Sequence, residues 1–422
     1  MKKKIVATLV IAMAMGVLAG CGGSSEGPIS PVSTLDPQPI LTDAPQRSKS
    51  SEESSEQPSV EKDPVVYDDG MSSGGETHKI GDRVQVDGKL QSWLTGEWKD
   101  ASVAERRSMA VMMPNNRRAG YKSTSPLLRQ NGISYASVIY EAPVEGRITR
   151  LMALFEDYDD LTTIGPVRSS RDYYVYEAMA FDAIYVNWGL ARPWVEELIN
   201  SDRVDNISAT VDGIYNGYDA AFKRDSSLIP GAVTEFTGYL DVAGYTKGVQ
   251  ARGYATDYDS SFGRIFEFAD DGYLATYDDC ADATKVYPGG TQTNSGGYGS
   301  HTPCFTYNAA DRLYYRTQWG AAHTDGMNDQ QLTVTNVIFK VCDGSERLPD
   351  DPNYDYLAFE TIGSGNAYIF TNGKVVEATW SRSSESSPTH YYDRSGNEIV
   401  LNQGKTWICC IWDDYAQYMS WE

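Results

Sequence analysis

The sequence predicts an α/β domain, with a mixed sheet and helices, followed by a mainly β domain. Three observations predict this order. Short apolar runs alternate with segments of helical spacing up to about residue 250. A stretch rich in Gly, Asp and Tyr follows over residues 251–300. Short alternating runs with turn signals fill residues 301–422. We therefore place the α/β domain at 83–250, a connection at 251–300 and the mainly β domain at 301–422.

The first domain opens with apolar runs of strand length. Helical spacing of Tyr174, Ala178 and Phe181 then predicts a helix. A further apolar run and a proline-led segment complete the pattern. The expected strands are 108–113, 137–142, 149–155 and 183–187, and the expected helices are 171–181 and 193–200.

The second domain carries a strong hairpin signal. Asn372-Gly373 separates the runs 367–370 and 375–380, and this dipeptide favours the two-residue turn that joins antiparallel strands. We expect a hairpin there.

The N-terminus has the layout of a secretory signal. Lys2, Lys3 and Lys4 precede an apolar run, which ends at Leu18-Ala19-Gly20-Cys21. This ending resembles the lipobox of bacterial lipoproteins. The resemblance implies a signal peptide over 1–20 and a diacylglyceryl, palmitate-bearing Cys21 on the outer face of the cell membrane. The alternative is an ordinary N-terminal membrane anchor.

A polar tether follows the cysteine, and the whole chain is acidic. Residues 21–82 are rich in Ser, Pro and Glu and cannot bury enough apolar surface to fold. The net charge is -22, and removal of the three lysines in residues 1–20 brings it to -25. Such a charge disfavours nucleic acid as a partner, so any anion site must be a local basic cluster.

Five cysteines remain after Cys21. Cys280 and Cys304 could form a disulfide across the Gly-rich segment, and Cys342 could pair with Cys409 or Cys410. The alternative is that Cys409 and Cys410 are buried free thiols, because they lie in an apolar run. Zinc is disfavoured, since the chain has no CxxC or paired-histidine spacing.

The segment 164–174 is the main candidate for a binding site. It should turn at Gly165-Pro166 and enter a helix near Ser169 or Ser170, where free backbone N–H groups favour anions. Arg168 and Arg171 flank the two serines, and Arg147 and Arg150 could converge on them. In the alternative, these arginines pair with nearby acids and the helix is merely capped. The acids in question are Asp172, Glu141 and Glu145.

Other polar groups could support chemistry. His323 and Asp325 lie two residues apart on an expected strand-edge loop, where such a pair can bind a metal or act as an acid with its orienting group. The alternative is a turn with a hydrogen-bonded histidine. The acidic runs 270–271 and 278–279, with Asp282, could bind Ca²⁺ or another divalent metal, but they lack the spacing of a calcium loop. We expect no cofactor.

Long motifs resemble a known family. Residues 145–155, 165–174 and 181–189 resemble the N-terminal domain of the YerB-like lipoproteins, and residues 312–412 resemble that family's C-terminal domain. The resemblance implies an envelope lipoprotein built on a domain of unknown function. Asn187-Trp188-Gly189 stands where the family usually has a histidine, and Arg224-Asp225 lacks the usual Pro-His-Asn run after it. Both departures weaken a catalytic role.

Three functions remain open. The first is a membrane-anchored protein that binds an anionic glycan or cell-wall precursor through the arginines. The second is an enzyme on phosphorylated wall precursors, in which Asp172 or the His323–Asp325 pair supplies a base or metal ligand. The third is a structural partner of other envelope proteins. With only four histidines in the chain, binding is favoured over catalysis.

Overall fold

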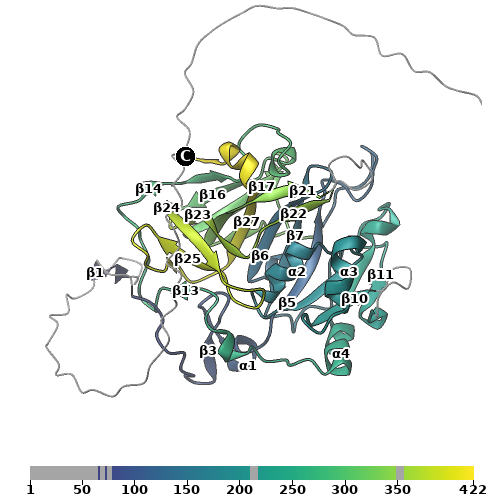
Figure 1. Cartoon of the computed structure of the whole chain (residues 1–422), viewed down its shortest axis with the longest axis horizontal. Helices are drawn as coiled ribbons and strands as arrows, with labels where there is room; N and C mark the ends of the chain where they lie inside the picture. The colour runs from purple at the N-terminus through teal and green to yellow at the C-terminus, as the bar shows by residue number, and fades with distance from the viewer. Residues whose placement is uncertain (1–64, 67–71, 74–77, 210–216, 348–355) are drawn as a thin grey trace, which may run out of the picture. The chain divides into compact units, whose positions relative to one another are not determined.

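One mixed sheet organises the chain. The structure, a computed structural model, describes residues 65–66, 72–73, 78–209, 217–347 and 356–422. Within these ranges eleven strands form the sheet (Figure 1). Its strands in spatial order are β10 (Asn206–Ala209), β9 (Ile184–Trp188), β5 (Met109–Asn115), β7 (Ile148–Phe155), β6 (Val138–Val144), β27 (Thr406–Trp412), β20 (Asn336–Cys342), β23 (Gly363–Thr371), β24 (Lys374–Arg382) and β14 (Ala281–Asp282), with β25 (His390–Asp393) also paired to β24.

Both faces of the central strands are buried. Every residue of β5 and of β6 is buried, which explains why these strands are continuous apolar runs rather than alternating ones. Two hydrophobic cores result, one on each face. Tyr140 and Met152 belong to the first core, and Ile139 and Leu151 belong to the second.

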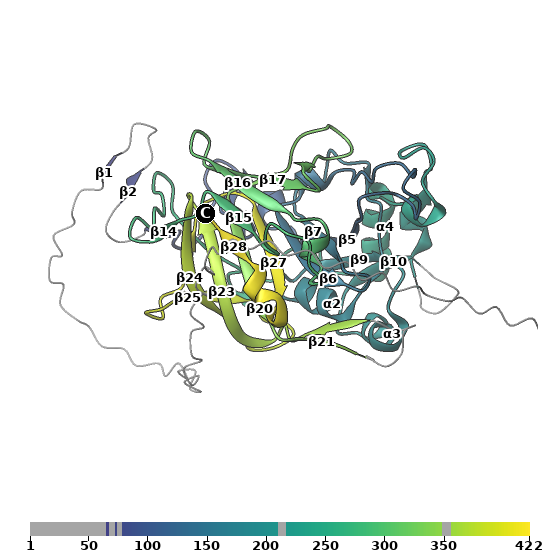
Figure 2. The same cartoon turned by 90° about the horizontal axis from the view of Figure 1, so that it is seen from above.

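Helices cover the first face. Helices α2 (Asp172–Met179) and α3 (Arg192–Asn200) contribute Tyr174 and Val195 to the first core. Seen from above, they lie on the opposite side of the sheet from β16 and β17 (Figure 2). Lys340 of β20 reaches Glu177 of α2 at 2.6 Å, and both side chains are buried. This ion pair links the helix to the half of the sheet that comes later in the chain.

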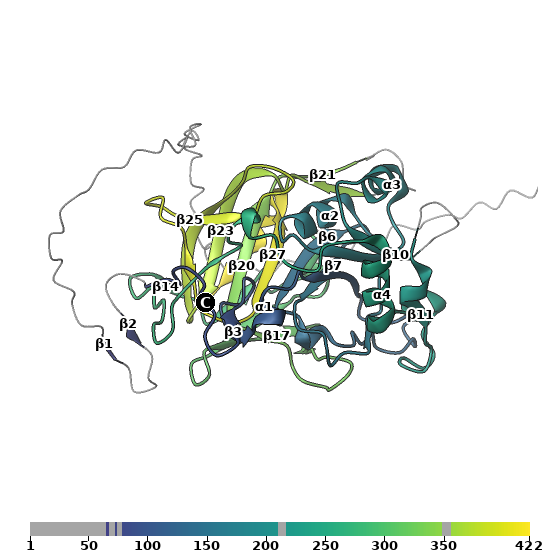
Figure 3. The same cartoon turned by 90° about the horizontal axis from the view of Figure 1, so that it is seen from below.

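A second sheet and one helix cover the other face. The six strands of this sheet among the described residues are β18 (Ala321–Ala322), β17 (Leu313–Gln318), β16 (Cys304–Asn308), β15 (Lys285–Tyr287), β28 (Ser420–Trp421) and β19 (Thr333–Val334). Helix α4 (Val242–Arg252) lies beside β10 and β11 (Figure 3). Phe305, Tyr314 and Tyr245 fill the second core from these elements.

Short elements complete the described part. The small sheets are β11 (Phe222–Arg224) with β12 (Gly238–Asp241) and β8 (Thr163–Ile164), β13 (Glu267–Phe268) with β26 (Val400–Leu401), β21 (Gly344–Glu346) with β22 (Leu357–Phe359), β3 (Lys89–Gln91) with β4 (Trp98–Asp100), and β1 (Val65–Val66) with β2 (Ser72–Ser73). The remaining helices are α1 (Ala101–Ala104) and the 3₁₀ turns η1 (Ile133–Tyr135), η2 (Asp219–Ala221), η3 (Thr234–Phe236), η4 (Ser260–Phe262), η5 (Tyr298–Ser300) and η6 (Asp413–Tyr418). In the described ranges no helix has the length and apolar character of a membrane span.

The fold differs in one respect from the expected pair of domains. The described chain is mostly β with few helices, and its mixed sheet is as expected. However, strands of the expected α/β domain and of the expected β domain lie in the same sheet. Strand β27 pairs in parallel with β6 on one side and with β20 on the other. The expected boundaries at 83–250, 251–300 and 301–422 therefore stay predictions. The expected signal peptide, Cys21 and most of the tether lie outside the described residues.

Candidate functional site

The arginine segment lies where two parallel strands end. Strands β5 and β9 pair with each other only near their first residues. Beyond that point, residues 168–170 lie between the two strands and hydrogen-bond to both sides. The Arg168 N–H donates to Met112 at 2.9 Å, and the Ser170 N–H donates to Gly189 at 2.8 Å. The chain then enters α2, with Arg171 as its N-cap residue. The turn and the helix start are close to the positions expected from the sequence.

Carboxylates of the protein itself neutralise two of the arginines. Arg171 is 4% exposed and forms a bidentate ion pair with Glu145. Arg168 pairs with Glu235 and lies over the ring of Phe236. Burial, reinforced by nearby Arg150, lowers the pKa of Arg168 to about 9. The pairing of Arg171 with Glu145 is the alternative that the sequence left open.

The negative charge at the N-terminus of α2 is supplied by the carboxylate of Asp172. Its carboxylate accepts from backbone N–H groups of its own residue and of Tyr173, and it also pairs with Arg347. Burial raises the pKa of Asp172, and Arg347 opposes that shift. The free N–H groups that would have held a phosphate are thus already in use.

The remaining residues of the expected arginine cluster do not form an open anion-binding site. Arg150 is 5% exposed and donates to the Ser169 carbonyl at 2.8 Å, and burial lowers its pKa. The Ser170 hydroxyl accepts from Tyr185 at 2.9 Å. Arg147 is exposed on the β6–β7 turn. Three of the four arginines therefore gather around residues 168–171, and Arg147 does not.

His323 and Asp325 belong to a separate cluster on the opposite face of the sheet. Its centre is Glu141 of β6, which is fully buried. One carboxylate oxygen accepts from Arg316 at 2.9 Å and from Trp407 at 2.9 Å. The other accepts from Thr149 at 2.6 Å and lies 3.1 Å from His301 Nε2. Burial alone would raise the pKa of Glu141, but Arg316 and His301 hold it well below its ordinary value.

Both ring nitrogens of His323 are engaged. Nδ1 accepts from Arg316 at 2.6 Å, because a guanidinium can only donate, and Nε2 therefore donates to Gln130 Oε1 at 2.9 Å. Burial, and then Arg316, lowers the pKa of His323 well below 6.5. The imidazole is neutral at pH 7 and has no lone pair left for a substrate proton.

Asp325 organises a loop. Its buried carboxylate accepts from the backbone N–H groups of Gly132 at 3.1 Å, Ser134 at 2.7 Å and Met327 at 2.6 Å. Among the described residues no hydrogen bond or ion pair joins His323 or Asp325 to Arg168 or Arg171. The expected acid–base constellation is therefore not assembled, since its members occupy opposite faces of the sheet.

A groove of about 560 Å³ opens above His323. We call it the His323 groove. Its buried lining side chains include Gln130, Gln318 and His323. Apolar residues of 126–128 and 228–230, together with Trp319, also line it, as do Arg117 and Arg129. An apolar pocket with a few convergent polar groups and a perturbed histidine is the usual form of a small-molecule site.

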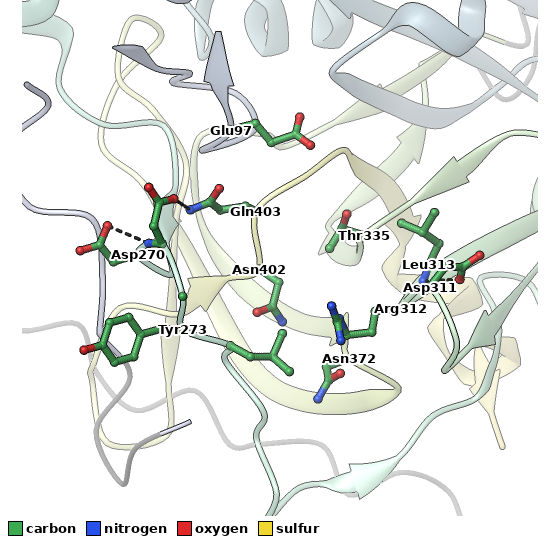
Figure 4. Close-up of a pocket in the computed structure, with 13 residues that line it drawn as sticks. Glu97, Asp270, Tyr273, Asp311, Arg312, Leu313, Thr335, Asn372, Asn402 and Gln403 are labelled. Atoms are coloured by element: carbon green, nitrogen blue, oxygen red, sulfur yellow. Dashed lines mark hydrogen bonds between the residues drawn. The ribbon is translucent and has the colours of Figure 1, made fainter. Parts of the chain in front are cut away.

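A second pocket, of about 340 Å³, is lined by Asp270 and Asp271, two of the acidic residues considered for calcium (Figure 4). Its polar side chains are engaged within the protein: Gln403 donates to Asp271 at 3.0 Å, and Asn402 donates to Thr371, outside the pocket, at 2.9 Å. In the described ranges no group of three or more His, Cys, Asp or Glu side chains could hold a metal ion. Nothing in this pocket therefore assigns it a cation.

The cysteines of the described chain are thiols. Cys280 precedes β14 at the edge of the main sheet, and Cys304 begins β16 in the second sheet; both are free. The suggested Cys280–Cys304 disulfide is not formed in this structure. Cys409 and Cys410 are free and buried in β27, in line with the thiol alternative.

The sequence named Glu141 only as a possible partner of the four arginines, whereas the structure pairs it with Arg316, which sequence reasoning missed. A signal existed: Glu141 is a lone acid in an apolar run, and Arg316 lies among Tyr, Thr and Trp. A buried charge of this kind demands an opposite partner. The sequence does not say which residue supplies it, since Glu141 and Arg316 are 175 positions apart.

Comparison with known proteins identifies the family. The N-terminal domain of a protein of unknown function (DUF3048) matches residues 94–254, and the C-terminal domain of the same family matches residues 295–408. The chain belongs to this family. A Bacillus subtilis (strain 168) protein named "Putative lipoprotein YerB" is 26% identical over 333 residues, which cover 79% of this chain and 89% of the relative. The crystal structure of the YerB protein from Bacillus subtilis has the same fold, with a TM-score of 0.60 and 23% identity over 79% of this chain and 99% of that one.

Proposed function

We propose that the protein is a lipid-anchored, extracytoplasmic component of the bacterial cell envelope that binds a small anionic ligand in the His323 groove. The signal-like N-terminus with Cys21 and the printed name of the Bacillus relative support the anchor. Its location on the outer face of the membrane follows from the lipobox resemblance. The ligand would be a fragment of an anionic glycan or a wall precursor.

The observation that carries the binding proposal is the composition of the groove. Its lining combines neutral, hydrogen-bonding side chains, apolar residues and two arginines. Arg117 is exposed and has no ion-pair partner in the described ranges. Arg129 pairs with Asp329, but both side chains are largely exposed, so that pair contributes little and can be exchanged for a ligand.

This proposal moves the anion contact away from the arginines first considered. Arg168 and Arg171 already hold carboxylates, and an external anion would have to displace them. Catalysis is the weaker alternative, because both nitrogens of His323 and the carboxylate of Asp325 are used in internal hydrogen bonds. A purely structural role becomes the conclusion if the groove binds nothing.

The test is a thermal-shift titration of the full-length chain in detergent with sn-glycerol 3-phosphate and with inorganic diphosphate. We expect stabilisation that is lost in the double variant Arg117→Gln/Arg129→Gln. The matched control, Arg192→Gln/Arg203→Gln, removes two exposed arginines elsewhere, with side chains 55% and 48% exposed, and should retain the shift.

A second pair of variants tests the groove itself. Ala322→Trp would fill the groove from β18, whereas Ala281→Trp places the same bulk on β14, another exposed two-residue strand. Loss of the shift in the first variant alone supports the groove. Equal behaviour of the two variants, or no shift with either anion, overturns the proposal.

A further inference from the structure

A third pocket, of about 360 Å³, lies where four loops meet. We call it the Trp412 pocket. It is bounded by the β6–β7 turn with Arg147, by residues 295–297, by Glu346 of β21, and by Trp412 and Tyr415 at the end of β27 and the start of η6. The pocket is distinct from the His323 groove and shares no residue with it.

Two aromatic rings form a fixed wall of this pocket. The rings of Trp412 and Tyr415 lie 5.1 Å apart at 62°, and Trp412 also meets Phe359 edge-on at 6.1 Å. The Tyr415 hydroxyl lies 3.2 Å from that of Ser295. Packing on one side and a hydrogen bond on the other hold both rings in place before any ligand arrives, so binding need not order them.

Glycines let the facing loop approach these rings. A Cβ atom at Gly296 would lie 2.5 Å from the Tyr415 ring. Gly297 has φ +78°, and a Cβ atom there would lie 2.9 Å from Pro143. Backbone N–H and C=O groups therefore border the pocket where side chains would otherwise fill it.

One positive charge in the pocket is uncompensated. Arg147 is exposed, at φ 57° on its turn, and no hydrogen bond or ion pair engages its side chain in the described ranges. The adjacent Glu145 is committed to the buried Arg171. Glu346, also exposed, supplies a carboxylate that can accept from hydroxyl groups.

We infer that the Trp412 pocket binds an anionic sugar, a pyranose that carries one carboxylate. A pyranose has an apolar face of C–H groups that packs on aromatic rings, while its hydroxyl groups bond to carboxylate and backbone groups at the edge. The sugar's own carboxylate pairs with the Arg147 guanidinium, whose fork of donors matches it. The volume is within the range of small-ligand sites.

The test uses an acidic and a neutral sugar that differ by one lactyl ether group, which carries the carboxylate. N-acetylmuramic acid and N-acetylglucosamine are titrated into the full-length chain in detergent, and dissociation constants are measured by saturation-transfer NMR. We expect the acidic sugar to bind about tenfold more tightly than the neutral one, as one added ion pair requires. Absence of binding by the acidic sugar overturns the inference.

Matched variants assign the two contacts. Arg147→Asn should remove the preference for the acid, and Arg312→Asn, which alters an arginine at the same kind of turn position with φ 58°, should keep it. Tyr415→Leu should weaken both sugars about tenfold, whereas Tyr418→Leu changes an exposed tyrosine of the same 3₁₀ helix and should weaken neither. A variant and its control that behave alike overturn the assignment.

Discussion

At the scale of single residues, the most informative side chain is Glu141. It is a fully buried carboxylate that holds Arg316 of the second sheet and Trp407 of β27. A buried ion pair of this kind contributes modestly when intact, but the loss of one partner leaves the other charge buried and unpaired. Glu141 should therefore be among the residues least tolerant of substitution.

Glu141→Gln tests this expectation. The amide keeps the shape but leaves Arg316 without its counter-charge, so we expect the free energy of unfolding to fall by about 3–5 kcal/mol. Urea denaturation followed by circular dichroism measures the change. Glu346→Gln, at an exposed position, is the control and should lie within about 0.5 kcal/mol of the unaltered chain. A similarly small effect at Glu141 would contradict the network's role.

The buried histidines predict a pH dependence. Burial lowers the pKa of His323, and that of His301, below the ordinary value of 6.5 in the folded chain. The unfolded chain therefore binds more protons below pH 6.5, and the free energy of unfolding falls as the pH falls from about 7 to 5. The slope approaches about 1.4 kcal/mol per pH unit for each histidine.

Denaturation curves between pH 5 and 8 measure this slope. In His323→Gln the side chain can still accept from Arg316 and donate to Gln130, but it no longer titrates. We expect its stability to depend less steeply on pH than that of the unaltered chain, by about one proton. Identical slopes would show that His323 is protonated in the folded state.

At the scale of elements, local signals set the strands and helices. The β23–β24 hairpin is an example: Asn372 and Gly373 have φ angles of 50° and 72°, which this turn requires. The segments 108–113, 137–142 and 149–155 are strands β5, β6 and β7 within a few residues. Helices α2 and α3 also form where the spacing indicates, because each buries one apolar face on the sheet.

Gly373→Ala tests the hairpin. A Cβ atom at this position strains the positive φ and would lie 2.8 Å from the Tyr307 ring. The control, Gly396→Ala, meets the same strain at φ 83° but has open space around it. We expect a loss of about 1 kcal/mol in the control and about 1–3 kcal/mol more in Gly373→Ala. Equal losses, measured by urea denaturation, would mean that Tyr307 moves aside without cost.

At the scale of the whole described chain, pairing between distant strands decides the architecture, and the sequence does not show it. Strand β27, near the C-terminus, lies between β6 and β20. The sequence identifies 407–412 as an apolar run but not its neighbours, because parallel partners are set by packing rather than by turns. For the same reason His323 was recognised as a polar candidate, whereas its partners Arg316 and Gln130 were not.

The position of β27 predicts that the two halves of the chain fold together. Without residues 301–422, strand β6 would lose its parallel partner, and Glu141 would lose Arg316 and Trp407. Strand β6 would then have an unpaired edge, and Glu141 would be a buried charge without a partner. Both changes favour aggregation over folding. We therefore expect residues 83–300 and 301–422, expressed separately, to show no cooperative melting by circular dichroism. The full chain should unfold in one calorimetric transition whose enthalpy equals the van't Hoff value. Two transitions in the full chain, or a cooperative melt of either fragment alone, would instead establish that the two halves are independent domains.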